Sequence, residues 1–462
     1  MSQKSLICAL AMLVGCEAPD PNFELYSCDD ATTTHCVQVT AEEPRALMTA
    51  VNTVLDSTTI ILGKGTYNYD NQVTIRGANE VALVGQGMDH TFLNFSEQEA
   101  QTNGVDVVAD DFLISDLTVQ DAKKDGVRIE DSDGVHIARL RVTWTNGPAT
   151  ENGAYGIYPV KSDNVLVEES EAYNSADAGL YVGQCQNAII RNNYAKNNVA
   201  GIEIENTQYA DVYGNIAEAN TGGLLIFDLP GNPVIGRDIR IHDNIVRNNN
   251  LPNFAKGGTV ASIPAGTGTV VLASRRVELF NNTYENNDTG DIAILNGLAI
   301  EGKESSWALN SADLVGDYVD LNLVTDGESV FNFRTEEIHV YDNTFSGSGT
   351  NADYSSVDDR PIGFILWAVY GDTIVDNILY DAIMESSFSP TDPAANSNDN
   401  HICVGESGEG TFASLDLETL GGRAANFDFG TVEDLFRPPA PFTPFDCDGL
   451  TLGPVADVEL SF

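Results

Sequence analysis

The fold is decided by two successive turns of a repeat that read GLYVGQCQNAIIRNNYAKNNVAGIEIENTQYADVYGN, residues 179–215. Each turn opens with a glycine, Gly179 or Gly201, that precedes a short apolar strand. Each closes a second strand with an apolar residue followed three positions later by an asparagine, Asn193 or Asn215. Both spacings are 22 residues. A fixed period of this length predicts a solenoid, in which each turn buries its apolar face against its neighbours.

The repeat continues on both sides of this stretch. Its strand-opening glycines are Gly104, Gly126, Gly156, Gly179, Gly201 and Gly223. The asparagine column consists of Asn193, Asn215, Asn244, Asn282, Asn343 and Asn377, and earlier turns carry Leu117, Leu140 and Ser170 at the equivalent place. The glycine spacings of 22, 30, 23, 22 and 22 residues show one turn per period with occasional insertions.

A 22-residue unit of three short strands with asparagine at one corner predicts an all-β fold, a right-handed single-stranded parallel β-helix. Each asparagine side chain can bond the turn backbone and the asparagine one coil away, which satisfies polar groups that the corner buries. Alternation along the strands supports this prediction, because Ile202 and Ile204 would point inward while Glu203 and Glu205 would point outward.

The sequence also predicts the organisation of the chain. We expect a signal peptide over residues 1–15, a linker or N-terminal segment over 16–39, the β-helix over 40–382 and a C-terminal loop and cap over 383–462. An amphipathic helix over residues 42–55 would cover the N-terminal end of the solenoid. Insertions that could wall a groove interrupt the rhythm at residues 143–154, 228–237, 250–268 and 296–332.

The charge balance limits the class of partner. The 462 residues contain 23 Lys and Arg against 69 Asp and Glu, which gives a net charge of −46. Nucleic acid is therefore a poor partner, because a polyanion gains no counterion release from another polyanion. Spread over the exposed faces of a solenoid, most of this charge serves solubility, and we expect a monomer.

Two stretches resemble the opening coils of pectate-lyase-like β-helix proteins: residues 59–67, TIILGKGTY, and residues 85–93, GQGMDHTFL. The chain from about residue 40 is similar to the right-handed β-helix repeat proteins of bacterial cell envelopes. That resemblance implies the solenoid fold and a groove on one face that takes a polymer such as a polysaccharide.

The first sixteen residues resemble a bacterial lipoprotein signal. A short apolar run over residues 6–14 is followed by Gly15 and Cys16. The resemblance implies that Cys16 is lipidated as the mature N-terminus. Because Glu17 follows it, the expected location is the outer membrane or cell surface, with the lipid as the only anchor. An ordinary signal peptide with an incidental cysteine is the alternative.

Export to an oxidising compartment predicts how the remaining cysteines pair. In an oxidising compartment the economical disulfides join Cys28 with Cys36 and Cys403 with Cys447. Cys185 is left over, and its place in a strand-like stretch predicts a small packed residue rather than a reactive thiol.

Alignment of the coils on their glycines predicts an outward face that could carry chemistry. Its first column is Arg128, Tyr158, Tyr181, Glu203 and Leu225. Its second column is Glu130, Val160, Gly183, Glu205 and Phe227, and its third is Asp131, Lys161, Gln184, Asn206 and Asp228. Coils stack about 4.8 Å apart, so these side chains lie within reach of one sugar chain. The alternative is an ordinary solvated strand face.

Glu203 and Glu205 form the most specific pair on this face, because residues two apart on a strand lie about 6.5 to 7 Å apart on the same side. Three interpretations stay open. The pair is exposed in an acidic protein; it binds Ca²⁺ with help from Asp228 or Asn206; or it serves an inverting glycosidase, whose carboxyl groups lie about 6.5 to 9.5 Å apart.

Residues 155–162, YGIYPVKS, resemble two enzyme families on this fold. In β-helix alginate C5-epimerases the strand carries Asp-Pro-His-Asp, of which only Pro159 is present here. Lys161 is similar to the basic residue of calcium-dependent alginate or chondroitin lyases, which removes the C5 proton while a Glu-x-Glu pair upstream helps to hold calcium. The upstream positions here are Ala154 and Gly156.

We therefore expect a surface lipoprotein that binds an anionic polysaccharide through a calcium bridge, with cleavage by β-elimination left open. The expected roles are Lys161 or Arg128 as base, Tyr158 and Tyr181 as sugar platforms, and Glu203, Glu205 and Asp228 as metal ligands. An epimerase or a glycoside hydrolase is a weaker match. The competing hypothesis is a non-catalytic β-helix that acts in binding or assembly in the bacterial envelope.

Overall fold

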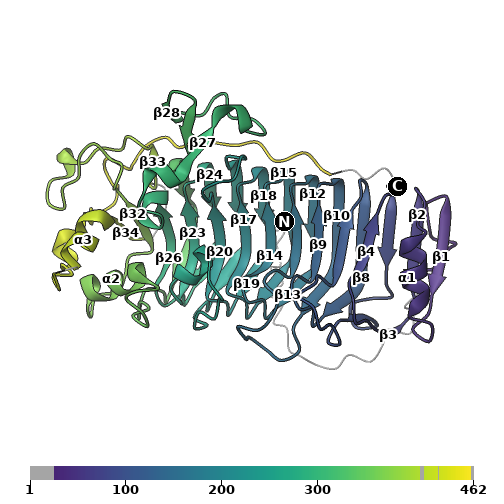
Figure 1. The fold of residues 1–462 in the computed structure, drawn as a ribbon. Helices are drawn as coiled ribbons and strands as arrows, with labels where there is room; N and C mark the ends of the chain where they lie inside the picture. The colour runs from purple at the N-terminus through teal and green to yellow at the C-terminus, as the bar shows by residue number, and fades with distance from the viewer. Residues whose placement is uncertain (1–24, 406–409, 425, 459–462) are drawn as a thin grey trace, which may run out of the picture.

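A computed structural model describes residues 25–405, 410–424 and 426–458, and shows a long stack of strands (Figure 1). The predicted signal peptide and the lipidation site Cys16 lie outside the described residues. The strands form three parallel sheets that run along the solenoid, and each turn of the chain contributes one strand to each sheet over most of its length. Among the described residues, no helix has the length and apolar character that crossing a membrane requires.

Sheet A contains the strands that precede the asparagine corner. They are β1 (His35–Val39), β2 (Thr58–Leu62), β5 (Val81–Val84), β8 (Phe112–Gln120), β10 (Asp133–Thr143), β12 (Asp163–Glu168), β15 (Gln186–Arg191), β18 (Gln208–Tyr213), β21 (Arg237–His242), β24 (Arg275–Phe280), β30 (Glu336–Tyr341) and β33 (Ile402–Cys403).

Sheet B contains the strands that the glycines open. They are β4 (Val73–Arg76), β7 (Val105–Val108), β9 (Val127–Glu130), β11 (Ile157–Val160), β14 (Ala178–Gly183), β17 (Ala200–Glu205), β20 (Gly222–Phe227), β23 (Thr267–Leu272), β26 (Gly290–Leu295), β32 (Ile378–Asp381) and β34 (Phe412–Leu415).

Sheet C is made of shorter strands that follow the corner, together with the second halves of β8 and β10. Its own strands are β3 (Gly65–Asn68), β6 (Thr91–Asn94), β13 (Glu171–Tyr173), β16 (Tyr194–Lys196), β19 (Ile216–Glu218), β22 (Ile245–Arg247), β25 (Thr283–Glu285) and β31 (Thr344–Ser346).

The core runs along the axis between the three sheets. Inward Val, Ile and Leu side chains of successive coils stack on one another, as Leu180, Ile202 and Leu224 do in sheet B, and each is at most 1% exposed. β-branched and Leu side chains suit this place because the strands between the two ends of each sheet are buried on their inner face and paired on both edges. The all-β, parallel β-helix prediction is confirmed.

The predicted asparagine ladder is confirmed from Asn193 to Asn343. Asn193 Oδ1 accepts from Ser170 N, and each later Oδ1 accepts from the backbone N and the side-chain Nδ2 of the asparagine one coil earlier, as Asn215 does from Asn193 at 2.9 and 3.0 Å. The prediction for Asn377 is wrong, because the insertion after β31 shifts the register. Asn377 precedes β32 in sheet B and donates to Asp291 Oδ2 at 2.9 Å instead.

A second ladder lies at the next corner, five residues after the first. It consists of Asn198, Asn220, Asn249 and Asn287. Its geometry repeats that of the first, and the hydroxyl of Ser348 ends it by accepting from Asn287 N at 3.0 Å. Two stacked amide rows therefore satisfy both corners that flank sheet C.

The N-terminal end is covered as predicted. Helix α1 (Arg45–Asn52) buries Leu47 and Val51 against the first coils, and is shorter than the predicted span. One strand, β1, comes before it and pairs with β2. Both predicted disulfides are present, Cys28 with Cys36 and Cys403 with Cys447, and Cys185 is a buried free cysteine.

Insertions decorate one side and the C-terminal end. A small antiparallel sheet, β27 (Ala308–Asn310), β28 (Val324–Asp326) and β29 (Ser329–Phe331), stands off the solenoid in Figure 1. Helices α2 (Pro361–Tyr370) and α3 (Leu417–Ala424) cover the C-terminal coils, and parallel pairing continues to β34, beyond residue 382. Short 3-10 turns are η1 (Thr259–Ser262), η2 (Gly297–Ala299), η3 (Glu304–Trp307), η4 (Ser311–Asp313), η5 (Pro393–Ala395) and η6 (Val432–Asp434).

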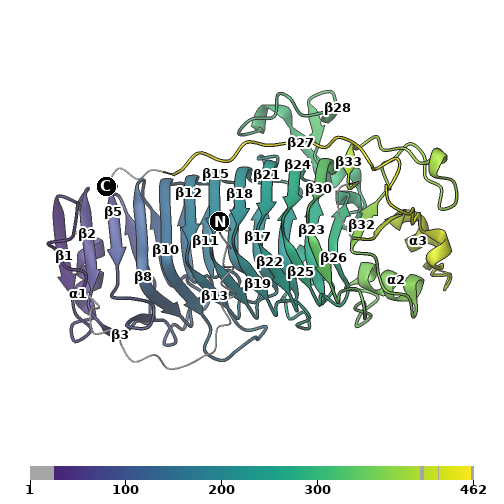
Figure 2. The same ribbon diagram turned by 180° about the vertical axis from the view of Figure 1, so that it is seen from behind.

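After Cys447 the chain turns back along the solenoid. Residues 448–458, which we call the strap, run from the C-terminal cap across sheet A towards the N-terminal coils, and both views show this yellow segment (Figures 1 and 2). The strap adopts no strand or helix, and its bonds are made to side chains.

Candidate functional site

The outer face of sheet B carries the side-chain columns that the sequence predicts. Register pairs Arg128 with Tyr158, Tyr181 with Glu203, and Glu203 with Leu225. Two features change along this face from the N-terminal to the C-terminal coils: charged side chains give way to tyrosines and then to carboxyl groups, and exposure falls.

Its N-terminal part is a row of alternating ion pairs. Arg76 Nη2 lies 2.6 Å from Asp106 Oδ2, and Arg128 bridges Asp106 Oδ1 at 3.7 Å and Glu130 Oε2 at 2.6 Å. Lys161 Nζ lies 3.4 Å from Glu130 Oε1. Three cations face two carboxylates, so the row is locally positive in a chain of charge −46. The Arg76 and Lys161 side chains are 54% and 50% exposed, and can meet a ligand.

A cluster of three tyrosines follows this row. The rings of Tyr155, Tyr158 and Tyr181 have centroids 4.5 to 4.9 Å apart, and the Arg128 guanidinium lies 5.8 Å from the Tyr158 centroid. Gly183 is required here, because a Cβ would stand 2.3 Å from the Tyr181 ring. Tyr155 and Tyr158 are half-buried, whereas Tyr181 is 4% exposed, so its ring is not part of the surface.

Glu203 and Glu205 point outward but are not solvated, which corrects the interpretation that they are simply exposed. They are 2% and 8% exposed. The insertion after β20 folds back over them, and its Asn232 donates to Glu205 Oε1 at 3.0 Å. Glu203 Oε2 is buried without a hydrogen-bond partner among the described groups, as is Asp177 Oδ1.

Burial determines the ionisation of this carboxyl group cluster, which consists of Asp177, Glu203 and Glu205. It raises the pKa of Asp177 and Glu203 well above the usual values, and the other carboxylates add to the shift. Burial also raises the pKa of Glu205, to about 7, although bonds from Tyr181 and Asn232 oppose the rise. The fold therefore favours the protonated forms of Asp177 and Glu203, and Glu205 is close to its titration point at neutral pH.

Burial alone would lower the pKa of Arg128, but Glu130, Tyr158 and Asp106 outweigh it and leave the pKa above its usual value. Arg128 is thus a permanent cation, which suits charge neutralisation and not proton removal. Of the two predicted bases, Lys161 is the one whose chemistry permits the role.

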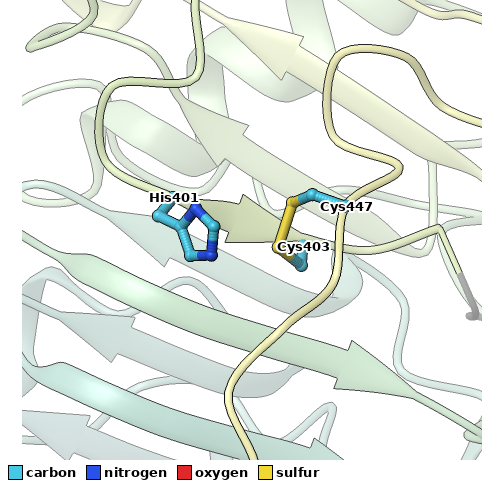
Figure 3. Close-up of side chains that lie close together, drawn as sticks. All are labelled: His401, Cys403 and Cys447. Carbon is cyan, nitrogen blue, oxygen red and sulfur yellow. A yellow bond between two sulfur atoms is a disulfide. The ribbon is translucent and has the colours of Figure 1, made fainter.

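Asp228 is already engaged by protein donors. Its Oδ2 accepts from Gly236 N and Asn332 Nδ2, both at 2.7 Å, and Ser274 Oγ lies 3.3 Å from its Oδ1. Glu203, Glu205 and Asp228 do not bring three ligand atoms within 4.8 Å of one another. Within the described ranges, the one such cluster is His401, Cys403 and Cys447, and Figure 3 shows both of its sulfurs in the disulfide.

Beyond β17 the face becomes apolar and closed. Leu225, Phe227, Val270 and Leu272 are each at most 2% exposed, because η1 and α2 contribute side chains that pack on them. The open part of the face is therefore confined to β4, β7, β9 and β11. Four strands at about 4.8 Å spacing give a binding surface about 14 Å long.

Sequence reasoning found Arg128, Tyr158, Lys161 and the glutamate pair, and the structure brings them onto one face. It missed Arg76 and Asp106, which belong to coils before Arg128, where the predicted columns begin. It also missed Asp177, which precedes a strand-opening glycine by two residues. The same offset gives Lys124, Ala154, Val199 and Thr221 in other coils, so the column shows no pattern that singles out Asp177.

Comparison with known proteins agrees with this fold. Residues 125–311 match the family described as "Right handed beta helix region". A search of curated proteins gave no match.

A search of solved structures found several that are similar to parts of this chain. The A-module of mannuronan C-5 epimerase AlgE4 from Azotobacter vinelandii is 14% identical, with a TM-score of 0.42 and coverage of 76% of this chain and 93% of that one. An alginate lyase from Paenibacillus sp. FPU-7 is 16% identical, with a TM-score of 0.37 and coverage of 69% and 100%. An exopolygalacturonase from Thermotoga maritima is 11% identical, with a TM-score of 0.40 and coverage of 56% and 86%. Their activities are stated of those proteins.

Proposed function

From the premise that this chain is a right-handed parallel β-helix protein, we propose that the open part of its sheet-B face binds an anionic polysaccharide. The observation that carries the proposal is the ion-pair row from Arg76 to Lys161. Its cations alternate with carboxylates; Arg76 and Lys161 are exposed, and Arg128 lies beside the half-buried ring of Tyr158. Guanidinium groups bind carboxylates or sulfates in two-point contacts, and an aromatic ring packs against the apolar face of a sugar.

The row can release cations for a ligand. Glu130 contacts both Arg128 and Lys161, and a uronate carboxylate that replaces Glu130 would find two cations already placed on adjacent coils. The gain is local, because the rest of the chain repels a polyanion. Salt screens long-range repulsion and attraction alike, so a change of ionic strength should have a modest effect on binding. Low ionic strength should therefore weaken binding less than the loss of Arg128 or Lys161 does.

We expect Lys161→Met to weaken polysaccharide binding about tenfold, because a partly exposed charge-assisted contact is lost. Affinity electrophoresis through gels with polygalacturonate, alginate or chondroitin sulfate measures this. Lys196→Met is the matched control, since Lys196 is a similarly exposed lysine that is paired with Glu218 on sheet C. Equal weakening by both variants, or equal retardation by neutral dextran, would contradict the proposed site.

Cleavage by β-elimination is the finer proposal. Lys161 Nζ would take the proton from C5 of a uronate, the C4–O bond would break with its electron pair on oxygen, a C4=C5 double bond would form, and the leaving oxygen would take a proton from water. Lys161 Nζ is held by Glu130 at 3.4 Å, so the proposed step requires that it leave this contact and approach C5. The same polysaccharides are incubated with the protein, and ultraviolet absorbance of unsaturated uronates is followed. Binding without absorbance would support the non-catalytic binding or assembly role instead.

We further propose calcium at the carboxyl group cluster, with Asp177 in place of the engaged Asp228. The uncompensated buried oxygens of Glu203 and Asp177 support this choice, since a cation would satisfy them. The carboxyl groups must first lose protons and move together, so the affinity for Ca²⁺ should rise with pH.

Millimolar Ca²⁺ is expected to raise the melting temperature of the protein at pH 8 and not at pH 5.5. Glu203→Gln should abolish that rise and Asp228→Asn should retain it; a rise retained by Glu203→Gln would refute the assignment.

Lipidation at Cys16 and a place at the outer membrane or cell surface remain proposals. The two disulfides support export to an oxidising compartment, where such bonds persist.

A further inference from the structure

The strap follows a path across seven coils of sheet A. His339 Nδ1 lies 2.9 Å from Leu450 O, Leu452 N donates to Glu278 Oε2 at 2.8 Å, and Val455 N donates to Asp211 Oδ2 at 3.1 Å. The end of the strap lies with Asp133 and Asn164 on β10 and β12. From Leu450 to Val455 the strap advances three coils, about 14 Å, which five residues cover only when they are extended.

The face beneath the strap is built to receive it. The side chains in register across the coils are His136, Leu166, Ile189, Asp211, Arg240, Glu278 and His339. Leu166 and Ile189 point outward, belong to neither hydrophobic cluster, and are still only 6% and 3% exposed. They lie on the path between the bond to Asp211 and the end of the strap, where the strap is placed to cover them.

The polar contacts on this face are also prepared in advance. Asp211 is held by two bonds from Arg240 Nη1 at 2.8 and 2.9 Å, and Glu278 by the Tyr341 hydroxyl at 3.1 Å. Both carboxylates are at most 3% exposed and each has an oxygen aimed at a strap amide. Because the strap crosses the strands instead of lying along them, these side chains replace the ladder bonds that an added strand would make.

Gly449 explains how the strap approaches the surface. A Cβ at this position would stand 2.1 to 2.5 Å from atoms of the His339 ring, so the backbone packs directly on the imidazole. The root of the strap is fixed two residues earlier by the disulfide from Cys447 to Cys403, which follows His339 in register on the next coil.

We propose that the outer face of sheet A from β30 to β10 is a peptide-binding surface, and that its occupant is the chain's own C-terminal segment, residues 449–458. The surface recognises an extended backbone through Asp211, Glu278 and His339, and apolar side chains through Leu166 and Ile189. The occupant is tethered, and a tether of this length gives an effective concentration in the millimolar range, so a free peptide cannot compete with it in the intact chain.

The test uses the full chain with a site-specific protease sequence inserted after Asp448, folded before it is cut. A fluorescent synthetic peptide of residues 449–458 is then added to the cut protein after the released segment has been removed. We expect the labelled peptide to bind the cut protein, to be displaced by unlabelled peptide, and to bind neither the uncut chain nor the cut protein when its sequence is scrambled. Failure of the labelled peptide to bind a cut protein that keeps its far-ultraviolet circular dichroism would overturn the proposal.

Two further measurements keep the test decisive. Asp211→Asn combined with Glu278→Gln should weaken peptide binding to the cut protein at least about tenfold, while Glu218→Gln, on sheet C, should leave it unchanged. In the intact chain, the amide hydrogens of Leu452 and Val455 should exchange far more slowly than in the free peptide. Exchange of both amides at the free-peptide rate would show that the strap does not occupy this face.

Discussion

Replacement of Asn215 by alanine is expected to lower the free energy of unfolding by about 3 kcal/mol or more. Asn215 is 1% exposed. Its Oδ1 accepts from N and Nδ2 of Asn193, and its Nδ2 donates to Ile190 O at 2.8 Å and Asn244 Oδ1 at 3.0 Å. Alanine removes all four of these bonds: Asn193 N and Ile190 O lose their side-chain partner, whereas Asn193 Nδ2 keeps its bond to Val167 O and Asn244 Oδ1 keeps its bond from the backbone N of residue 215.

Urea unfolding followed by circular dichroism measures the change. Asn322→Ala is the control, because Asn322 is exposed in the insertion after β26, and its loss should change stability by less than about 0.5 kcal/mol. A loss for Asn215→Ala no larger than for Asn322→Ala would mean that the ladder does not hold the corner together.

Glu205→Gln is expected to remove about 2 kcal/mol of the dependence of stability on pH between pH 5.5 and pH 8.5. Burial raises the pKa of Glu205 from 4.5 to about 7 in the folded chain, so the folded state holds its proton more tightly than the unfolded state. That stabilisation is complete below pH 4.5 and is lost as pH rises towards 7. The wild type should therefore lose stability over this interval, and the variant should lose less.

The glutamine retains an oxygen that can accept from Asn232, so the comparison isolates ionisation. Glu218→Gln gives the opposite sign: despite partial burial, bonds from Lys196 and Arg247 lower the pKa of Glu218, and the change should reduce stability at pH 8.5. Chemical unfolding at both pH values supplies the data. Parallel pH profiles for wild type and Glu205→Gln would contradict the ionisation inferred for the carboxyl group cluster.

The fold could be predicted because the repeat appears in the sequence twice, as apolar alternation and as a polar corner. Asn193 and Asn215 fix the period, and Ile202 with Ile204 fix which side of the strand faces inward. The second ladder was equally visible, since Asn198 and Asn220 stand at a constant five residues from the first, but one ladder already accounted for the period.

The site was less predictable, because a strand pattern gives direction and not exposure. Glu203 points outward as alternation requires, and its burial depends on insertions whose paths carry no periodic signal. For the same reason nothing in the sequence placed residues 448–458 on Asp211, which lies 244 residues from Val455.

Because each coil adds one step to the asparagine ladder, the number of residues in a coil does not determine how far that coil extends the solenoid. Asn193 and Asn215 are 22 residues apart, and Asn282 and Asn343 are 61 residues apart. Each pair nevertheless joins adjacent coils through a hydrogen bond of 3.0 Å between the two side-chain amides. Loop closure costs free energy only as the logarithm of loop length, so a coil tolerates a long excursion provided that its corner residue returns to the row. The excursions that cover Glu205 and the C-terminal coils therefore lengthen the chain between coils without interrupting the row of asparagines.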